Sequence, residues 1–442
     1  MEMRGGMAEQ DAKCPLEKVD RRLEDAHRQW HAADEGYFDP EEFRRSIQSV
    51  IQTLRTVTFM LQSMKSDIPD FDQWYGGWQE RLKADPLMRW MVEARNRIEK
   101  QGDLELHSFV RAEVIASYLE EGPRVEVPAN LFDGLKSLIE GLPTGQVGKH
   151  LATHGILKVE RRWVENTLPD LELLEAAAVA YSRLTELVVD AHRHLGLAAP
   201  ETIDHRTGEV IQPQPTNRPP CMIDHGTSRS IHVSIEDGRV LRFEEKAITV
   251  TRKKAETAAK KYGFKNAQDI FGKAGEPYEA TLASLFKTAR SIFKRDQYHD
   301  SMVFIFRDRN LIDIRGFRPD NQQDKYLMMR KLAADVQKMG GDAIIQLNEV
   351  WTAKYDPREP YRRAVDAPNR RELLTADLVQ RDGPVRHLSA EIRRNKTRAH
   401  LGPTVAVDNP SLFAFAPILL AWGSKLPEEW VAEMSKLDSK QE

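Results

Sequence analysis

The sequence predicts a multidomain α+β protein, in which an N-terminal all-α helical bundle is followed by an α+β domain with a largely antiparallel sheet. Apolar residues recur at helical spacing through most of the N-terminal half. The C-terminal half carries apolar segments joined by short polar turns, which is typical of β-hairpins. A proline-rich stretch separates them, and 442 residues exceed what one core usually holds. The predicted parts are a mobile tail at 1–15, a bundle at 16–197, a linker at 198–222, an α+β domain at 223–425, and a C-terminal helix and tail at 426–442.

The composition is that of a soluble globular protein, with 40% hydrophobic and 30% charged residues. The 65 basic and 68 acidic residues give a net charge of -3, so no overall field favours nucleic acid or an anionic membrane. Cys14 and Cys221 lie far apart, and their spacing indicates neither a disulfide framework nor a zinc site, so we expect no cofactor. No apolar run is long enough for a signal peptide or a membrane span. We therefore expect a cytoplasmic protein with no membrane partner.

Helix signals in the bundle are clearest at two N-termini. Asp39 and Asp85 are natural N-caps, and each is followed by a proline at the first helical position, where the missing N–H is tolerated. Gly102 supplies a C-terminal stop. The bundle is predicted to contain helices at 16–33, 39–65, 71–82, 85–103, 107–119 and 168–195, with an extended segment at 122–128 and loops at 131–155.

The linker contains five prolines separated by polar residues, which predicts an extended segment that buries no core. The chain beyond it alternates between strand and helix patterns. We predict a hairpin at 230–243 around an Asp-Gly turn, helices at 252–262, 278–295 and 324–339, and strands at 302–306, 311–314, 343–351, 373–380 and 386–393.

The helix at 85–103 carries Arg95 and Asn96 beside its apolar stripe. Together with the upstream segments LRTVTFMLQ and FDQWY, this helix resembles the HEPN superfamily of bacterial and archaeal helical proteins. In the ribonuclease members, an Arg followed by a polar residue meets a nearby His across a dimer and cuts RNA without a metal. The resemblance covers roughly residues 35–195. It implies a catalytic role for Arg95 and Asn96 and a homodimer formed through the helical domain.

The HEPN-like motif is incomplete in this chain. Lys100 lies near the place where the His is expected, and His107 comes too late. Without an imidazole, no group is poised to exchange a proton with a 2′-hydroxyl. Lys100 could contact phosphate, although an ordinary lysine is a poor base. The alternative is structural: Arg95 bonds a neighbouring helix or loop, and Asn96 holds a backbone group.

The C-terminal domain offers acidic residues for a Mg²⁺-dependent nuclease site. His299-Asp300 precedes one strand, Asp324-Lys325 opens a helix, and Glu349 lies near the end of another strand. Alternatively, Asp324 is an N-cap and Glu349 is a buried, paired carboxylate. The segments HDSMVFIFRD and GGDAIIQLNEVWTAK resemble a domain of uncharacterised bacterial and phage proteins, and this resemblance implies no activity.

The segment at 246–265 is locally basic, with Tyr262 and Phe264 interleaved. Its charges could follow phosphates along one side of a helix, or they could simply form a solvated face. Basic residues at 386–398 could extend the same surface. The predicted nucleic-acid-binding residues are Arg252, Lys253, Lys254, Lys260 and Lys261.

Three functional hypotheses follow from these patterns. The first is a HEPN-like binding protein for RNA or a protein partner, in a defence or toxin-antitoxin setting. The second is a ribonuclease that uses Arg95, Asn96 and Lys100, or an acidic site with Mg²⁺. The third is a purely structural or phage-associated interaction protein.

Overall fold

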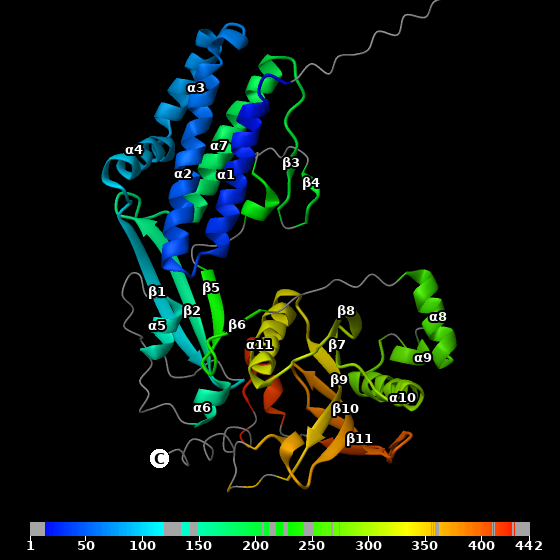
Figure 1. Ribbon diagram of the computed structural model, residues 1–442. Helices are drawn as coiled ribbons and strands as arrows, with labels where there is room; N and C mark the ends of the chain where they lie inside the picture. The colour runs from blue at the N-terminus through cyan, green and yellow to red at the C-terminus, as the bar shows by residue number, and fades with distance from the viewer. Residues whose placement is uncertain are drawn as a thin grey trace, which may run out of the picture. The chain divides into compact units, whose positions relative to one another are not determined.

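The computed structural model of the chain describes residues 14–118, 134–141, 149–205, 207–211, 218–223, 229–242, 251–266, 268–273, 275–354, 356, 358, 362–408, 410, 412–426 and 428 (Figure 1). The predicted extended segment at 122–128, and nearly all of the predicted tail and C-terminal helix, lie outside these residues. The chain forms two compact units. The first is Met1–Glu113, Val125–Leu142 and Leu157–Val233, and the second is Val114–Arg124, Pro143–Ile156 and Ser234–Glu442.

The first unit is built on a helical bundle, in which α1, α2 and α7 run side by side (Figure 1). Its buried residues form one core that includes Trp30, Phe43, Leu54 and Leu174, each 1% exposed or less. The predicted α+β class is confirmed, with helices dominating this part of the chain. The helical elements are α1 (Glu17–Glu35), α2 (Pro40–Ser63), η1 (Lys65–Asp67), α3 (Phe71–Ala84), α4 (Pro86–Gln101), α5 (Leu135–Glu140) and α7 (Leu173–His194).

The predicted caps of α2 and α4 are confirmed. The Asp39 carboxylate accepts hydrogen bonds from the first-turn N–H groups of α2, and the Asp85 carboxylate accepts from the backbone N–H groups of Leu87 and Met88. Gly102 ends α4 in the left-handed conformation with φ of 91°. Both ends of α4 are therefore fixed by neighbouring residues, Asp85 at its start and Gly102 at its end.

The helix predicted at 107–119 is wrong, because this segment forms strand β1 (Leu106–Ile115). A second unpredicted strand, β2 (Ile156–Glu165), lies between β1 and β5 (Arg229–Ser234) in the sheet order. The apolar residues of β1 fit both periodicities, but its β-branched side chains favour a pleated surface. The buried side chains of β2 include those of Val159, Arg161 and Trp163, which alternate along the strand.

The predicted linker contains structure within its described residues. Strands β3 (Thr202–Ile203) and β4 (Val210–Ile211) pair, and η3 (Pro220–Met222) forms a single turn. Cys221 and Met222 of this turn are each 1% exposed and belong to the helical core. The expectation that this stretch buries no core residue is wrong at its C-terminal end, where two apolar side chains follow the last prolines.

The second unit contains an antiparallel sheet with the strand order β12-β11-β10-β9-β7-β8, with β13 also paired to β11. Strand β9 pairs with β7 rather than β8, so Met302 lies opposite Leu347. One core lies between α10 and the sheet. The elements are α6 (Lys149–His154), β6 (Val240–Leu241), α8 (Arg252–Tyr262), α9 (Gln268–Phe271), α10 (Tyr278–Asp296), β7 (Met302–Arg307), β8 (Asn310–Gly316), α11 (Gln322–Lys338), β9 (Ala343–Thr352), η4 (Ala364–Asp366), β10 (Arg371–Gln380), β11 (Arg386–Arg394), β12 (Ala399–Leu401), β13 (Val405–Asp408), η5 (Phe413–Phe415) and α12 (Ala416–Ala421).

The predicted elements of the second unit agree closely with these bounds, with one correction at α11. The N-cap is Asn321, whose side chain accepts from the backbone N–H of Asp324, so the proposal that Asp324 itself caps the helix is wrong. The Asp324 carboxylate instead accepts from the backbone N–H of Asp320. No helix in the described part of the chain has both the length and the apolar character needed to cross a membrane.

Candidate functional site

The predicted basic residues of the second unit lie on α8. Thr251 caps this helix through its side chain, and Gly263 ends it in the left-handed conformation. All five basic side chains are exposed or nearly so. Arg252 is paired with Glu256 at 2.8 Å. Among the described residues, Lys253, Lys254 and Lys260 form no ion pair, so their charges face solvent.

The C-terminal end of α8 is fixed against the C-terminal end of α10. Lys261 contacts the Asp296 carboxylate at 2.8 Å, and the Tyr262 hydroxyl donates to the same carboxylate at 2.5 Å. The hydrogen bond from Lys261 lowers the pKa of Asp296, and Asp296 raises the pKa of Lys261. Lys294 at the end of α10 is exposed and, in the described part of the chain, unpaired. The C-terminal ends of α8 and α10, both of which carry basic residues, therefore lie together.

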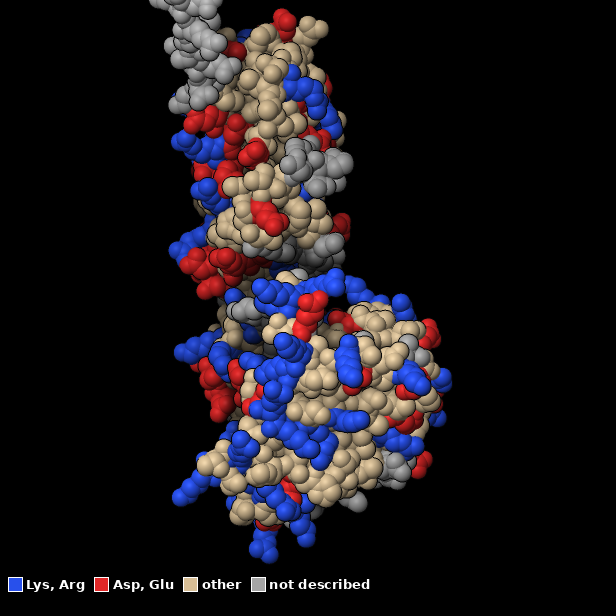
Figure 2. All heavy atoms as spheres, turned by 90° about the vertical axis from the view of Figure 1, so that its right-hand side faces the viewer, with Lys and Arg blue, Asp and Glu red and all other residues tan. Residues whose placement is uncertain are grey.

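The turn between β11 and β12 joins this surface through Gln297. Arg394 donates to the Gln297 backbone carbonyl at 3.1 Å, and the Ala399 backbone N–H donates to the Gln297 side chain at 2.6 Å. Lys396 and Arg398 of the turn are exposed. Figure 2 shows a face of the second unit on which Lys and Arg side chains gather.

We use the name basic face for a set of exposed cations from α8, the end of α10 and the β11–β12 turn, which is given in full below. An aromatic ring stands beside it, because Tyr298 follows Gln297 directly and is 55% exposed. Of the basic residues at 386–398, those of the turn are exposed, whereas two arginines at the end of β11 are paired. Arg393 is neutralised by Glu391, and Arg394 by Glu372 and Glu349. The members of the basic face are Lys253, Lys254, Lys260, Lys261, Lys294, Lys396 and Arg398.

In the first unit, Arg95 and Asn96 lie together at the surface of α4. The Arg95 guanidinium contacts Glu99 at 2.5 Å and donates to the Asn96 side-chain oxygen at 3.4 Å. It also lies 5.6 Å from the centre of the Phe59 ring. Lys100 is exposed on the next turn. Arg95 is therefore held by Glu99 of its own helix and by the Phe59 ring of α2, and the Asn96 side-chain oxygen accepts from Arg95.

A second guanidinium, that of Arg55, lies near Phe59 on α2. Arg55 is 4.5 Å from the centre of the same ring, and Phe59 is 42% exposed. Burial lowers the pKa of Arg55, and the nearby positive charge of Arg95 acts in the same direction. Arg55 also lines a cavity of about 360 Å³ between α2, α3, α4 and α7, whose lining combines apolar side chains such as Met91 with polar ones such as Gln62. Two cations and an exposed ring thus form a small surface platform.

Within the described residues, the side chains predicted for a Mg²⁺ site in the second unit do not cluster. Glu349 accepts from the backbone N–H of His299 and is paired with Arg394 at 3.1 Å, so it is the paired carboxylate that the sequence suggested. Burial raises the pKa of Glu349 and lowers that of His299. Asp324 belongs to the first turn of α11. Among the described residues, none of these three joins a cluster of three potential metal ligands.

The structure instead brings together a group that the sequence interpretation missed. His27 and His31 of α1 meet Cys221 of η3, and the three ligand atoms lie within 4.8 Å of one another. The two histidines are four residues apart, a spacing that places both on one face of a helix, and this was the available signal. The cysteine could not be assigned from spacing because it comes almost two hundred residues later. A second group consists of Cys14, Asp20 and His192. Its sulfur lies 4.0 Å from the His192 ring nitrogen, farther than the 3.1 Å that separates the Cys221 sulfur from His27.

These features define an α+β protein with a helical first unit and a basic surface on its second unit. The chain belongs to the family described as bacteriophage lambda protein ea47, which it matches over residues 8–436. It is 30% identical over 347 residues to Protein ea47 of Escherichia phage lambda, covering 76% of this chain and 79% of that protein. No solved structure matches it. These matches show that the chain is a phage-related protein, in agreement with the resemblance of its C-terminal segments to a domain of bacterial and phage proteins.

Proposed function

We propose that this phage-related protein binds RNA through the basic face of its second unit. The observation that carries the proposal is the convergence of α8, the end of α10 and the β11–β12 turn, which brings exposed cations from three elements to one surface. The protein as a whole carries a charge of only -3, so this is a local concentration of positive charge.

The chemistry of the basic face suits single-stranded nucleic acid. Lysine side chains on flexible stems neutralise phosphates without demanding a fixed geometry. Exposed aromatic rings provide planes on which bases stack, and Tyr298 offers such a plane beside Gln297. We therefore expect binding that depends strongly on salt and weakly on sequence.

Removing three of the α8 charges tests the proposal. In the variant with Lys253→Gln, Lys254→Gln and Lys260→Gln, we expect the dissociation constant for a single-stranded RNA to rise about tenfold or more at moderate salt. The slope of log K against log salt should decrease in magnitude by about 2, since each lost phosphate contact contributes about 0.7 for single strands. Fluorescence anisotropy titrations at several salt concentrations measure both quantities.

The matched control removes three exposed lysines of the first unit, with Lys18→Gln, Lys83→Gln and Lys136→Gln. This variant has the same net charge as the α8 variant and should retain the wild-type salt slope. Equal losses in both variants would mean that the affinity follows total charge, and the basic face would not be the binding surface. Binding of duplex DNA in preference to RNA would also contradict the proposal.

A second candidate, ribonuclease activity at Arg95 and Asn96, is favoured by the platform around Phe59. Arg55 and Arg95 could hold a phosphate while the exposed ring stacks a base. We expect RNA cleavage, if this site is catalytic, to survive EDTA and to be lost in Arg95→Ala. Lys136→Gln, on α5, serves as the control for an exposed cation outside this platform. Cleavage that EDTA abolishes would exclude this metal-independent mechanism, and an absence of cleavage would leave Arg95 with its structural role.

A further inference from the structure

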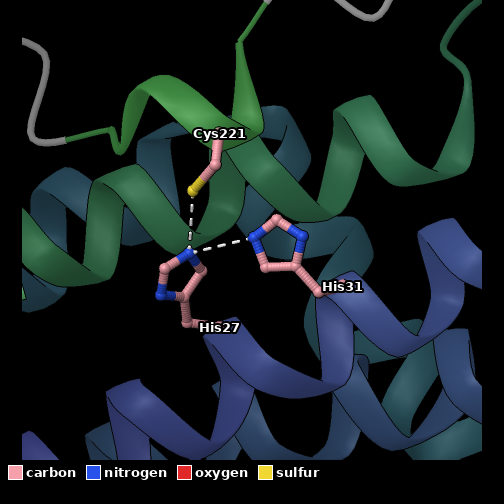
Figure 3. A group of neighbouring side chains, drawn as sticks. All are labelled: His27, His31 and Cys221. Carbon is pink, nitrogen blue, oxygen red and sulfur yellow. Dashed lines mark hydrogen bonds between the residues drawn. The ribbon is translucent and has the colours of Figure 1, made fainter. Parts of the chain in front are cut away.

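We propose that His27, His31 and Cys221 bind one Zn²⁺ ion, which ties helix α1 to the turn η3 (Figure 3). This site is independent of RNA binding and lies in the helical core of the first unit. Figure 3 shows both imidazoles rising from α1 toward the Cys221 sulfur, with His27 at the centre of the group. The ligand atoms come from the two histidine side chains and one thiol, which is a donor set that zinc prefers.

Two of the three separations between ligand atoms are close to those around a tetrahedral ion, and the third is within 4.8 Å. The Nε2 atom of His27 lies 3.2 Å from Nε2 of His31 and 3.1 Å from Sγ of Cys221. Usual zinc bond lengths at tetrahedral angles place two nitrogens about 3.3 Å apart and a nitrogen and a sulfur about 3.6 Å apart. The two nitrogens are already at about the required separation, and the sulfur must move about half an ångström away from the His27 nitrogen.

The surroundings of His27 also match those of a metal ligand. Its other ring nitrogen, Nδ1, faces the Glu24 carboxylate at 3.8 Å. Zinc-bound histidines usually present their second nitrogen to a carboxylate or carbonyl group, which fixes the tautomer. The charge of Glu24 would balance the positive charge that remains after zinc binds one thiolate.

Burial argues against a reactive thiol at this position. A cysteine hydrogen-bonded to a histidine can be a nucleophile, but such a cysteine must be accessible to its substrate. Cys221 is 1% exposed and His27 is 0% exposed. The His205 ring also lies over His31, with centroids 4.5 Å apart and planes 26° apart. Among the described residues, no fourth His, Cys, Asp or Glu joins this group, so we assign the fourth position of the zinc to a water molecule.

Metal analysis of the purified full chain tests the site. After exposure to zinc and removal of excess metal, we expect the wild-type chain to retain a zinc equivalent that Cys221→Ser and His31→Gln lose. Cys14→Ser is the matched control, because it removes the other cysteine and should retain this equivalent. With Co²⁺ in place of zinc, a sulfur-to-metal charge-transfer band should be present in wild type and Cys14→Ser and absent in Cys221→Ser.

A folding control keeps the result interpretable. His31→Cys replaces one ligand by another, so it should retain the metal and strengthen the charge-transfer band even if His31→Gln folds poorly. EDTA should lower the melting temperature of wild type and Cys14→Ser by about 5 °C, and should leave that of Cys221→Ser unchanged. Failure of the wild-type chain to retain zinc, or equal retention by Cys221→Ser, would overturn the proposal.

Discussion

Replacing Arg229 by Met is expected to lower the free energy of unfolding of the first unit by about 3 kcal/mol. Arg229 begins β5 and forms an ion pair with Asp34 near the end of α1. Its guanidinium lies over the rings of Tyr37 and Trp30, with centroids 5.0 Å and 5.8 Å away. Burial lowers the pKa of Arg229 to about 10, so the group remains charged at neutral pH. Removal of the cation leaves Asp34 largely buried without its partner.

A double variant and an exposed pair distinguish this explanation from a simple loss of packing. Asp34→Asn combined with Arg229→Met removes both charges and should recover most of the lost stability, because the unpaired charge is the main cost. Arg193→Met disrupts a pair with Asp190 in which the arginine side chain is 75% exposed, and it should change stability by less than about 1 kcal/mol. Urea unfolding followed by tryptophan fluorescence measures all of these variants. A double variant as unstable as Arg229→Met would contradict the charge argument.

The first unit is expected to lose stability as the pH rises from about 5 to 8, because of Glu172. Burial raises the pKa of this carboxyl from 4.5 to about 7. The folded unit therefore binds a proton that the unfolded chain releases above its ordinary pKa. The resulting stability is fully present below pH 4.5 and is lost as the pH rises through 7. Each pKa unit corresponds to about 1.4 kcal/mol, so this group accounts for about 3 kcal/mol at most.

Glu172→Gln should remove the contribution of Glu172 to this dependence, leaving that of Asp20, whose pKa burial also raises to about 7. The variant should make the first unit about 2–3 kcal/mol more stable than wild type at pH 8. The Glu172 side chain accepts from the backbone N–H of Glu175 at 2.9 Å and from the Tyr37 hydroxyl at 3.2 Å. The glutamine oxygen can still accept from Glu175, while its amide donates to the Tyr37 oxygen and the Tyr37 hydroxyl donates to the Arg161 carbonyl.

Glu172→Ala provides the contrast, since it removes the N-cap acceptor of α7 and should cost about 1 kcal/mol or more at pH 5. Unfolding in urea at pH 5 and pH 8 gives the comparison. If the wild-type and Glu172→Gln stabilities change in parallel with pH, the carboxyl of Glu172 is not the titrating group.

Much of the fold could be predicted because local chemistry specifies it. The α4 helix has a proline after its N-cap and a glycine at its end, and α8 has the predicted bounds. The β1 segment could not be assigned in the same way, because its apolar residues fit a helix as well as a strand and its partner β2 comes much later in the chain. Sheet pairing is a property of two segments, which a pattern within one segment does not contain.

The same distinction applies to the candidate sites. The cations of α8 were identified from one short segment, and their charge is evident in the sequence. The Tyr298 ring and the β11–β12 turn join them only through contacts of Gln297, so the extent of the basic face required the structure. The His27 and His31 pair was visible at helical spacing, but Cys221 reaches it only through packing of η3 on the bundle. Residues far apart in the chain are brought together by tertiary contacts that no local motif encodes.

The placement of β9 beside β7 has a consequence for synthesis of the chain. The β7–β8 and β10–β11 pairs join consecutive strands, whereas the β7–β9 pair waits until α11 and the residues after it have left the ribosome. Until then, the buried strand β7 presents an open edge that can pair with another chain. The nascent second unit is therefore most vulnerable to aggregation while translation passes through α11, and slow translation at that point would prolong the exposure.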